Sequence, residues 1–168
     1  MAGSRPRLSR GEVGAWVFKG NPAVWDYRAA LAAVDRRPGV ATAHAWTVGV
    51  THRARLIEPG DPMVVWITGP DEPGIYEIGL ATGRVGTCRV GTGSTDGAQG
   101  ATSDVVPIAS VLLSAHVPRD DLRADPVLRG AEQFRIPLIR NPTYLTPEQR
   151  DALTEHLEQS ELRTAGWL

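Results

Sequence analysis

Hydrophobic positions in the first half of the chain fall into short runs with the composition of strands. Four runs, at residues 14–19, 44–48, 63–68 and 75–82, are rich in β-branched and aromatic side chains. The last two are joined by GPDEPG at 69–74, a sequence that is typical of tight turns. We therefore predict that these two strands pair as an antiparallel hairpin.

A helix is predicted directly after the first strand. Asn21 is its expected N-cap, Pro22 is its first helical residue, and RRPG at 36–39 ends it. Between these limits, hydrophobic residues recur at spacings of three and four, which indicates an amphipathic stripe: Val24, Tyr27, Leu31 and Val34.

The second half of the chain combines a loop, a long strand and two helices. Residues 91–104 are rich in glycine, serine and threonine and are predicted to form a loop. Residues 105–117 follow as a long strand, in which Pro107 indicates an edge position or a bulge. A short helix is expected near 121–129, and TPEQ at 146–149 is a capping box that opens a final helix.

Several strands with helices near both ends predict an α+β, barrel-like domain. The 168 residues fit one domain, which is expected to span 14–168 after a small, polar and basic tail at 1–13 that we predict to be disordered. The tail lacks the apolar run of a secretory signal, and no stretch approaches the ~20 apolar residues of a membrane span. With Cys88 as the single cysteine, we expect a cytoplasmic protein without membrane contact, disulfides or a cysteine-based zinc cluster.

Charge and composition narrow the chemistry. The net charge of −1 argues against holding nucleic acid by a global positive field, so a nucleic-acid binder of this kind needs a local basic patch and a specific pocket. Cys88 with His44 or His52 has no third group that would mark a catalytic site. The four histidines lack metal-ligand spacing, and GTGSTDGAQG at 91–100 lacks the ending of a phosphate-binding loop. We predict no catalytic residue, no metal and no cofactor.

Five segments, taken in order and with their spacing, resemble a known family. They are WVFKGNP at 16–22, WTV at 46–48, IEPGD through VWITG at 57–69, GIYEIG at 74–79 and RNPTYLT at 140–146. Together they are similar to the EVE domain of the PUA-like superfamily, a relative of the YTH RNA readers. The similarity spans residues 14–160.

This resemblance implies a PUA-like pseudo-barrel of five or six strands flanked by helices, with a pocket for a base flipped out of a nucleic acid. The implied ligand class is cytosine or adenine carrying a methyl or hydroxymethyl group, and DNA is the nucleic acid that we expect to carry it. Bacterial members of the family accompany modification-dependent restriction, so a restriction nuclease or another effector protein is an implied partner. The expected function is a non-enzymatic reader of a modified base.

Such a pocket needs an apolar surface on which the base stacks. Trp46 is the expected stacking residue because it matches a cage tryptophan of the YTH domains. The alternative is that Trp46 only fills the interior of the barrel and contacts no ligand. Trp66 lies in an apolar strand, where burial in the core is the stronger expectation. Tyr76 fits either position.

The pocket also needs polar groups for the edge of the base. Lys19, Gly20 and Asn21 lie at the turn from strand to helix, where backbone N–H groups point outwards and can donate to a base or a phosphate. Thr47 and Thr68 place hydroxyl groups next to the two central tryptophans.

Neighbouring phosphates need local positive charge. Arg53 and Arg55 belong to HRAR at 52–55, the densest basic cluster outside the tail, and Arg84 and Arg89 flank the exit of the hairpin. Two alternatives stay open: an RNA-binding module of the PUA or ASCH type, and a sensor that binds a free nucleoside in the same pocket. A basic rim around the pocket favours a polymer, whereas a neutral or acidic rim favours the small ligand.

Overall fold

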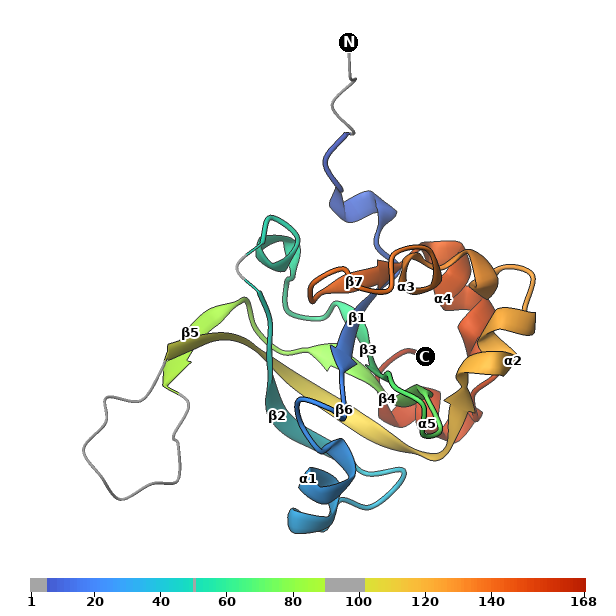
Figure 1. Ribbon diagram of the computed structural model, residues 1–168, viewed down its shortest axis with the longest axis horizontal. Helices are drawn as coiled ribbons and strands as arrows, with labels where there is room; N and C mark the ends of the chain where they lie inside the picture. Colours follow the sequence, from blue (N-terminus) through green and yellow to red (C-terminus); the bar gives the residue numbers. More distant parts are fainter. Residues whose placement is uncertain (1–5, 50, 90–101) are drawn as a thin grey trace.

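The computed structural model describes residues 6–49, 51–89 and 102–168. Within them the fold is a seven-stranded sheet flanked by short helices (Figure 1). The strands are β1 (Ala15–Gly20), β2 (Ala41–Thr47), β3 (Pro62–Ile67), β4 (Gly74–Ala81), β5 (Gly86–Arg89), β6 (Thr102–Pro118) and β7 (Thr143–Leu145). The α-helices are α1 (Tyr27–Ala33), α2 (Arg119–Ala124), α3 (Glu132–Arg135), α4 (Pro147–Thr154) and α5 (Gln159–Thr164), and the 3-10 helices are η1 (Arg10–Glu12), η2 (Ala54–Leu56) and η3 (Leu128–Gly130).

The sheet is mixed because β1 and β3 run parallel, with Phe18 opposite Val65, whereas its other strand pairs are antiparallel. The order is β2-β6-β4-β3-β1-β7, and β5 pairs with β6 outside this path. The N–H of Gly49, which follows β2, donates to the carbonyl of Asn141, which precedes β7, at 3.2 Å. This contact joins the two edge regions, so the sheet curls into a pseudo-barrel.

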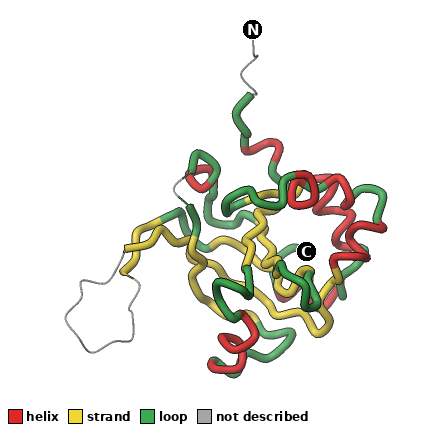
Figure 2. Tube along the Cα trace, in the orientation of Figure 1, coloured by secondary structure: helices red, strands yellow, loops and turns green. Residues whose placement is uncertain are grey.

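Alternate side chains of the central strands fill two separate hydrophobic clusters. Trp16 and Phe18 belong to a cluster that includes Tyr27 of α1, and this side of the sheet is called the α1 face below. Val17 and Trp66 belong to a cluster that includes residues of α2, α4 and α5, on the side called the helical face (Figure 2). A parallel strand pair inside a sheet is normally buried on both sides in this way. Each large apolar side chain that is fully buried contributes roughly 1.5–3 kcal/mol.

The predicted α+β class and the five strand positions are confirmed. The runs at 14–19, 44–48, 63–68 and 75–82 correspond to β1, β2, β3 and β4, and β3 and β4 form the predicted antiparallel hairpin. The run at 105–117 lies within β6. The described residues contain two further strands, β5 and β7, which are only four and three residues long and raise the number above the expected five or six.

The start of the first helix was predicted wrongly. Asn21 closes a tight turn, in which its Oδ1 accepts from the N–H of Ala23 at 3.0 Å. The helix begins at Tyr27 instead, because the Asp26 carboxylate caps it by accepting from the N–H of Ala29 at 2.9 Å. The stripe is therefore incomplete: Tyr27 is buried and Leu31 half-buried, but Val24 lies outside the helix and is 86% exposed.

The capping box at the start of α4 is confirmed. Thr146 Oγ1 accepts from the N–H of Gln149 at 3.2 Å, and Gln149 Oε1 accepts from the N–H of Thr146 at 3.0 Å. The final helical region is divided into α4 and α5, and the helix expected near 121–129 is divided into α2 and η3. Residues 91–101 of the predicted loop lie outside the described residues, and 102–104 begin β6.

The pairing on the two sides of Pro107 shows how this proline fits into β6, a long inner strand. On one side it is paired with Ala45 of β2. On the other side the β4 pairing ends at Ile108, and the Pro107 carbonyl still accepts from the N–H of Thr82 at 2.9 Å. A Cβ on Gly83 would lie 2.7 Å from Pro107 Cγ, so the proline ring requires a glycine beside it.

Part of the expected N-terminal tail has fixed contacts. Arg10 in η1 donates to both carboxylate oxygens of Asp61, at 2.9 and 2.7 Å. Residues 1–5 lie outside the described part of the chain. Of the helices that the structure describes, none has the length and apolar character to cross a membrane.

The α1 face contains a buried carboxylate, Glu77. Tyr27 Oη donates to it at 2.7 Å, Arg36 Nη1 pairs with it at 2.8 Å, and Ser110 Oγ also donates to it. His44 Nε2 lies 3.4 Å from the second oxygen of Glu77. Burial alone would raise the pKa of Glu77, but the hydrogen bonds from these four groups together lower it to about 2.

We predict that acid destabilises the fold through Glu77. The pKa of Glu77 falls from 4.5 in the unfolded chain to about 2 in the fold, so its stabilisation is complete above pH 4.5 and is lost as the pH falls towards 2. A shift of this size corresponds to about 3 kcal/mol. Urea unfolding of the wild type between pH 7 and 2.5 should show this loss, and Glu77→Gln should lack most of it while being less stable at pH 7.

The control is Glu148→Gln, which removes an exposed carboxylate and should keep the wild-type pH dependence. Equal pH dependence in the wild type and Glu77→Gln would contradict the prediction.

Candidate functional site

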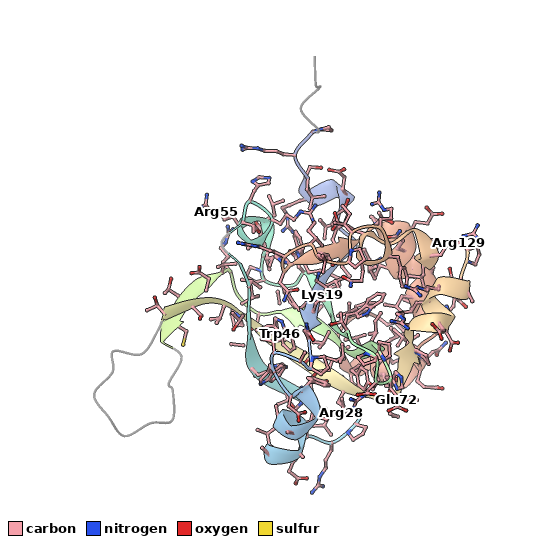
Figure 3. All side chains as sticks on the ribbon, in the orientation of Figure 1. Lys19, Arg28, Trp46, Arg55, Glu72 and Arg129 are labelled. Carbon is pink, nitrogen blue, oxygen red and sulfur yellow. The ribbon has the colours of Figure 1, made fainter. Side chains whose placement is uncertain are left out.

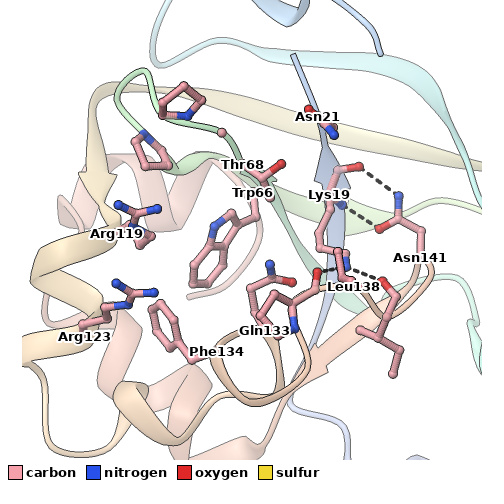
Figure 4. A pocket seen from close by; sticks show the side chains of 15 residues that line it. Lys19, Asn21, Trp66, Thr68, Arg119, Arg123, Gln133, Phe134, Leu138 and Asn141 are labelled. Atoms are coloured by element: carbon pink, nitrogen blue, oxygen red, sulfur yellow. Dashed lines mark hydrogen bonds between the residues drawn. The ribbon is translucent and has the colours of Figure 1, made fainter. Parts of the chain in front are cut away.

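A cavity of about 750 Å³ opens on the helical face and is called the helical-face cavity below (Figure 4). Its volume lies in the range of small-molecule sites. The lining comes from the ends of β1 and β3, from the turn after β3, from α2 and α3, and from the loop before β7. These residues are Lys19, Asn21, Trp66, Thr68, Gly69, Pro70, Pro73, Arg119, Arg123, Gln133, Phe134, Pro137, Leu138, Ile139 and Asn141.

The inner wall of this cavity is aromatic. The alternation along β3 directs Trp66 to the helical face, where it is only 2% exposed. Phe134 of α3 meets it edge to face, with 5.3 Å between ring centroids and 76° between planes. The guanidinium of Arg123 lies 5.2 Å from the centre of the Phe134 ring. This gives an apolar wall with a cation at one end.

Gln133 supplies the polar group deepest in this wall. The residue is only 7% exposed, and its Oε1 has no hydrogen-bond partner in the protein. Figure 4 shows its amide between Trp66 and Leu138. Among the described residues, four buried side-chain atoms have no hydrogen-bond partner. Two of them, Gln133 Oε1 and Arg119 Nε, belong to residues that line this cavity. A buried acceptor left unpaired costs about 1–3 kcal/mol, so this amide is suited to a ligand.

The cavity rim is basic although the whole chain carries a net charge of −1. Lys19, Arg119 and Arg123 are cationic, and none of the lining residues is an aspartate or a glutamate. Lys19 stands on one side of Trp66 and the two arginines stand on the other (Figure 4). Such an arrangement attracts a negatively charged ligand by local field rather than by net charge.

Lys19 also holds the cavity together. Its Nζ donates to the carbonyls of Pro137, at 3.2 Å, and of Ile139. Its backbone N–H donates to Asn141 Oδ1 at 2.8 Å, and Asn141 Nδ2 donates back to the Lys19 carbonyl at 2.9 Å. Burial lowers the pKa of the Lys19 ammonium, and the Glu132 carboxylate partly opposes this. The loop at 137–141 is thereby fixed against β1.

Four of the eight residues predicted for the base pocket line this cavity: Lys19, Asn21, Trp66 and Thr68. Trp46 does not, because it belongs to the cluster on the α1 face, where it is 7% exposed and packs edge to face against Trp25 at 5.5 Å. Trp46 and Trp66 therefore lie on opposite faces of the sheet, and no single base can contact both.

The other three predicted pocket residues also lie outside the helical-face cavity. A Cβ on Gly20 would lie 2.9 Å from Ile67 Cδ1 and 3.6 Å from Trp46 Cζ2, so this glycine allows close packing on the α1 face. Thr47 is exposed at the end of β2. Tyr76 stacks on His116, with ring centroids 4.6 Å apart and planes 9° apart.

Three of the four arginines predicted to bind phosphate, Arg53, Arg55 and Arg84, do not line this cavity. Arg53 is held by Glu132 through two hydrogen bonds of 2.6 and 2.8 Å. Arg55 and Arg84 line a separate cavity of about 300 Å³, and Figure 3 shows Arg55 at the edge of the molecule, away from Lys19. Arg89 belongs to β5, where its backbone pairs with Thr102.

The cations that do line the cavity beside Lys19 are Arg119 and Arg123, which the sequence interpretation missed. They are four residues apart in α2, a spacing that places both on one face of a helix, whereas the helix was expected only from residue 121. The pair was missed because the predicted start of this helix was two residues too late. Gln133 and Phe134 gave no comparable signal, because α3 is only four residues long.

No family model and no curated protein matches this sequence. Several solved structures do have a similar fold. PSPTO5229 from Pseudomonas syringae has a TM-score of 0.58 and 15% identity, covering 84% of this chain and 98% of that one. The DUF55 domain of human thymocyte nuclear protein 1 has a TM-score of 0.56 and 13% identity, covering 86% and 99%. Human THYN1 in complex with 5-methylcytosine-containing DNA has a TM-score of 0.54 and 15% identity, covering 86% and 98%. At these identities the likeness shows the fold, and it confirms the predicted PUA-like class.

We predict that Lys19→Met loosens the loop at 137–141. The variant removes the ammonium that binds two loop carbonyls, and losing a charged hydrogen bond costs about 1.5–3 kcal/mol. Local opening should therefore increase, and the amide of Ile139, which donates to Ile136, should exchange with deuterium roughly tenfold faster or more. Hydrogen–deuterium exchange with fragment analysis measures this.

Arg119→Met is the matched control, because it removes another rim cation for which the structure gives no hydrogen bond to this loop. Unchanged exchange of the loop in Lys19→Met would show that Lys19 does not hold it.

Proposed function

We propose that this protein is a non-catalytic reader, of the EVE type, of a modified base in nucleic acid, and that the base enters the helical-face cavity. The observation that carries the proposal is the buried amide oxygen of Gln133, which has no hydrogen-bond partner, beside the aromatic wall of Trp66 and Phe134. The fold shared with THYN1, which binds 5-methylcytosine-containing DNA in its complex, supports the choice of ligand class. An effector protein such as a restriction nuclease is the proposed partner.

In this mechanism the base first leaves its stack, which costs a few kcal/mol. It then packs against the Trp66–Phe134 wall, and this contact with an aromatic surface offsets about 1–3 kcal/mol of the cost. Arg119 and Arg123 lie at the rim, where they can neutralise the phosphates next to the extruded nucleotide. Thr68 and Asn21 offer further polar groups at the mouth.

The Gln133 amide matches the edge of cytosine or adenine. Its Oε1 can accept from an exocyclic amine, and its Nε2 can donate to the neighbouring ring nitrogen. Such a paired contact is worth about 1–3 kcal/mol of discrimination. A buried methyl group adds about 0.8 kcal/mol, which is roughly fourfold in affinity. The hydrogen-bonded edge therefore selects the base, and the apolar wall adds the preference for the methylated form.

The first prediction concerns the ligand and the phosphate contacts. Fluorescence polarisation with DNA and RNA probes, plain or carrying methylcytosine, hydroxymethylcytosine or methyladenine, should show binding that depends on one modification. Log K falls with log salt, and each phosphate contact contributes about 0.9 to the steepness of this fall. The double variant Arg119→Ala/Arg123→Ala should therefore make the slope shallower by roughly 2.

Arg55→Ala/Arg84→Ala is the control, because these residues line the other cavity. Binding that ignores the modification would contradict the reader function. Binding to free nucleosides alone would favour the sensor, and binding to RNA alone would favour the RNA module.

The second prediction is that Gln133→Leu weakens binding and stabilises the fold. Leucine removes an unpaired buried acceptor, so the free energy of unfolding should rise by about 1 kcal/mol or more. The same change removes the contact with the base edge, so affinity for the preferred modified probe should fall roughly 10- to 100-fold. Urea unfolding and fluorescence polarisation on the same variant measure the two effects.

Gln149→Leu is the matched control, because Gln149 is also buried but has its partner in the capping box of α4. It should lower stability and leave binding unchanged. A Gln133→Leu variant that keeps full affinity would remove Gln133 from the site.

A further inference from the structure

The rim of the helical-face cavity carries an exposed leucine. Leu138 is 95% exposed, the highest exposure of any large hydrophobic residue that the structure describes. A single exposed apolar side chain needs no explanation by itself. Leu138 differs from the others because it lines the cavity and because its backbone is held in place.

The backbone on both sides of Leu138 is fixed by one cation. Lys19 Nζ binds the carbonyl of Pro137 before it and that of Ile139 after it. The N–H of Ile139 donates to the carbonyl of Ile136 at 3.1 Å, which closes a turn around the leucine. The chain thus holds Leu138 on a rigid support while its side chain stays in water, which is unfavourable unless a ligand covers it.

The position of Leu138 relative to the cations fits a nucleic acid that spans the cavity mouth. Figure 4 shows Leu138 beside Lys19, with Arg119 and Arg123 on the other side of Trp66. A strand whose phosphates lie along the two arginines would therefore bring its extruded base towards Trp66 and its remaining stack towards Leu138. The lining residues near this path include no carboxylate.

We propose that Leu138 is a wedge that enters the base stack and fills the space left by the extruded base, so that the ligand is duplex DNA. This proposal rests on the reader function proposed above. Apolar side chains that insert between base steps are a recurring way of holding DNA open. Only a duplex leaves a gap with a stacked floor and an unpaired partner base, so the wedge contributes to duplex binding and not to binding of a single strand.

The test compares Leu138→Ala with the wild type on three probes: a duplex with one modified cytosine or adenine, the same duplex with a mismatch opposite that base, and the single strand. Burial of a leucine side chain corresponds to roughly 10- to 100-fold in affinity, so the matched duplex should lose that much. The mismatched duplex, whose base is easier to extrude, should lose less, and the single strand should change by less than about twofold.

Ile136→Ala is the matched control, because Ile136 is also exposed, at 42%, and directly precedes the loop at 137–141 without lining the cavity. It should bind all three probes like the wild type. Leu138→Phe keeps an apolar wedge and should retain duplex binding. Circular dichroism should show all three variants folded, since both side chains lie in water.

A second readout follows the duplex directly. With 2-aminopurine placed beside the modified base, the wild type should increase its fluorescence on binding, and Leu138→Ala should increase it less at saturating protein. Equal loss on all three probes, or no loss on the duplex, would overturn the wedge while leaving the reader function in place. A wild type that binds none of the modified probes selectively would overturn both.

Discussion

The position of the candidate site depends on the parallel pairing of β1 and β3. Side chains along both strands alternate between two apolar clusters, so the middle of β1 and β3 carries no polar side chain. The polar residues of these two strands therefore lie where the strands end. Because the strands are parallel, their carboxyl ends meet at one edge, where the N–H of Thr68 donates to the carbonyl of Gly20 at 2.9 Å. Lys19, Asn21 and Thr68 are neighbours for this reason.

The other half of the site comes from residues more than a hundred positions away. The loop at 137–141 reaches β1 through the paired hydrogen bonds between Asn141 and the backbone of Lys19, and the Lys19 ammonium binds two more of its carbonyls. A lysine that could have been a plain phosphate ligand is thus used mainly to position the loop. The same contacts bring Leu138 into the lining of the cavity that Gln133 also lines.

The sequence predicted what depends on local patterns. The strands, the β3–β4 hairpin and the capping box at Thr146 follow from residue types at short spacing, and they are confirmed. The choice between Trp46 and Trp66 could not be made in this way, because it depends on which face of the curled sheet each strand position meets. Gln133 was out of reach as well, since its role comes from a missing hydrogen bond in a four-residue helix.

The charge distribution decides how such a site would divide its affinity between the nucleic-acid backbone and the base. A general DNA binder makes about 6–10 phosphate contacts and loses much of its affinity as salt rises. This chain has a net charge of −1 and three cations at the cavity, so two or three phosphate contacts are the most that the rim supports. Non-specific binding is then weak, and most of the binding free energy has to arise inside the cavity. A reader with this rim is selective because it lacks the field that would hold it on unmodified DNA.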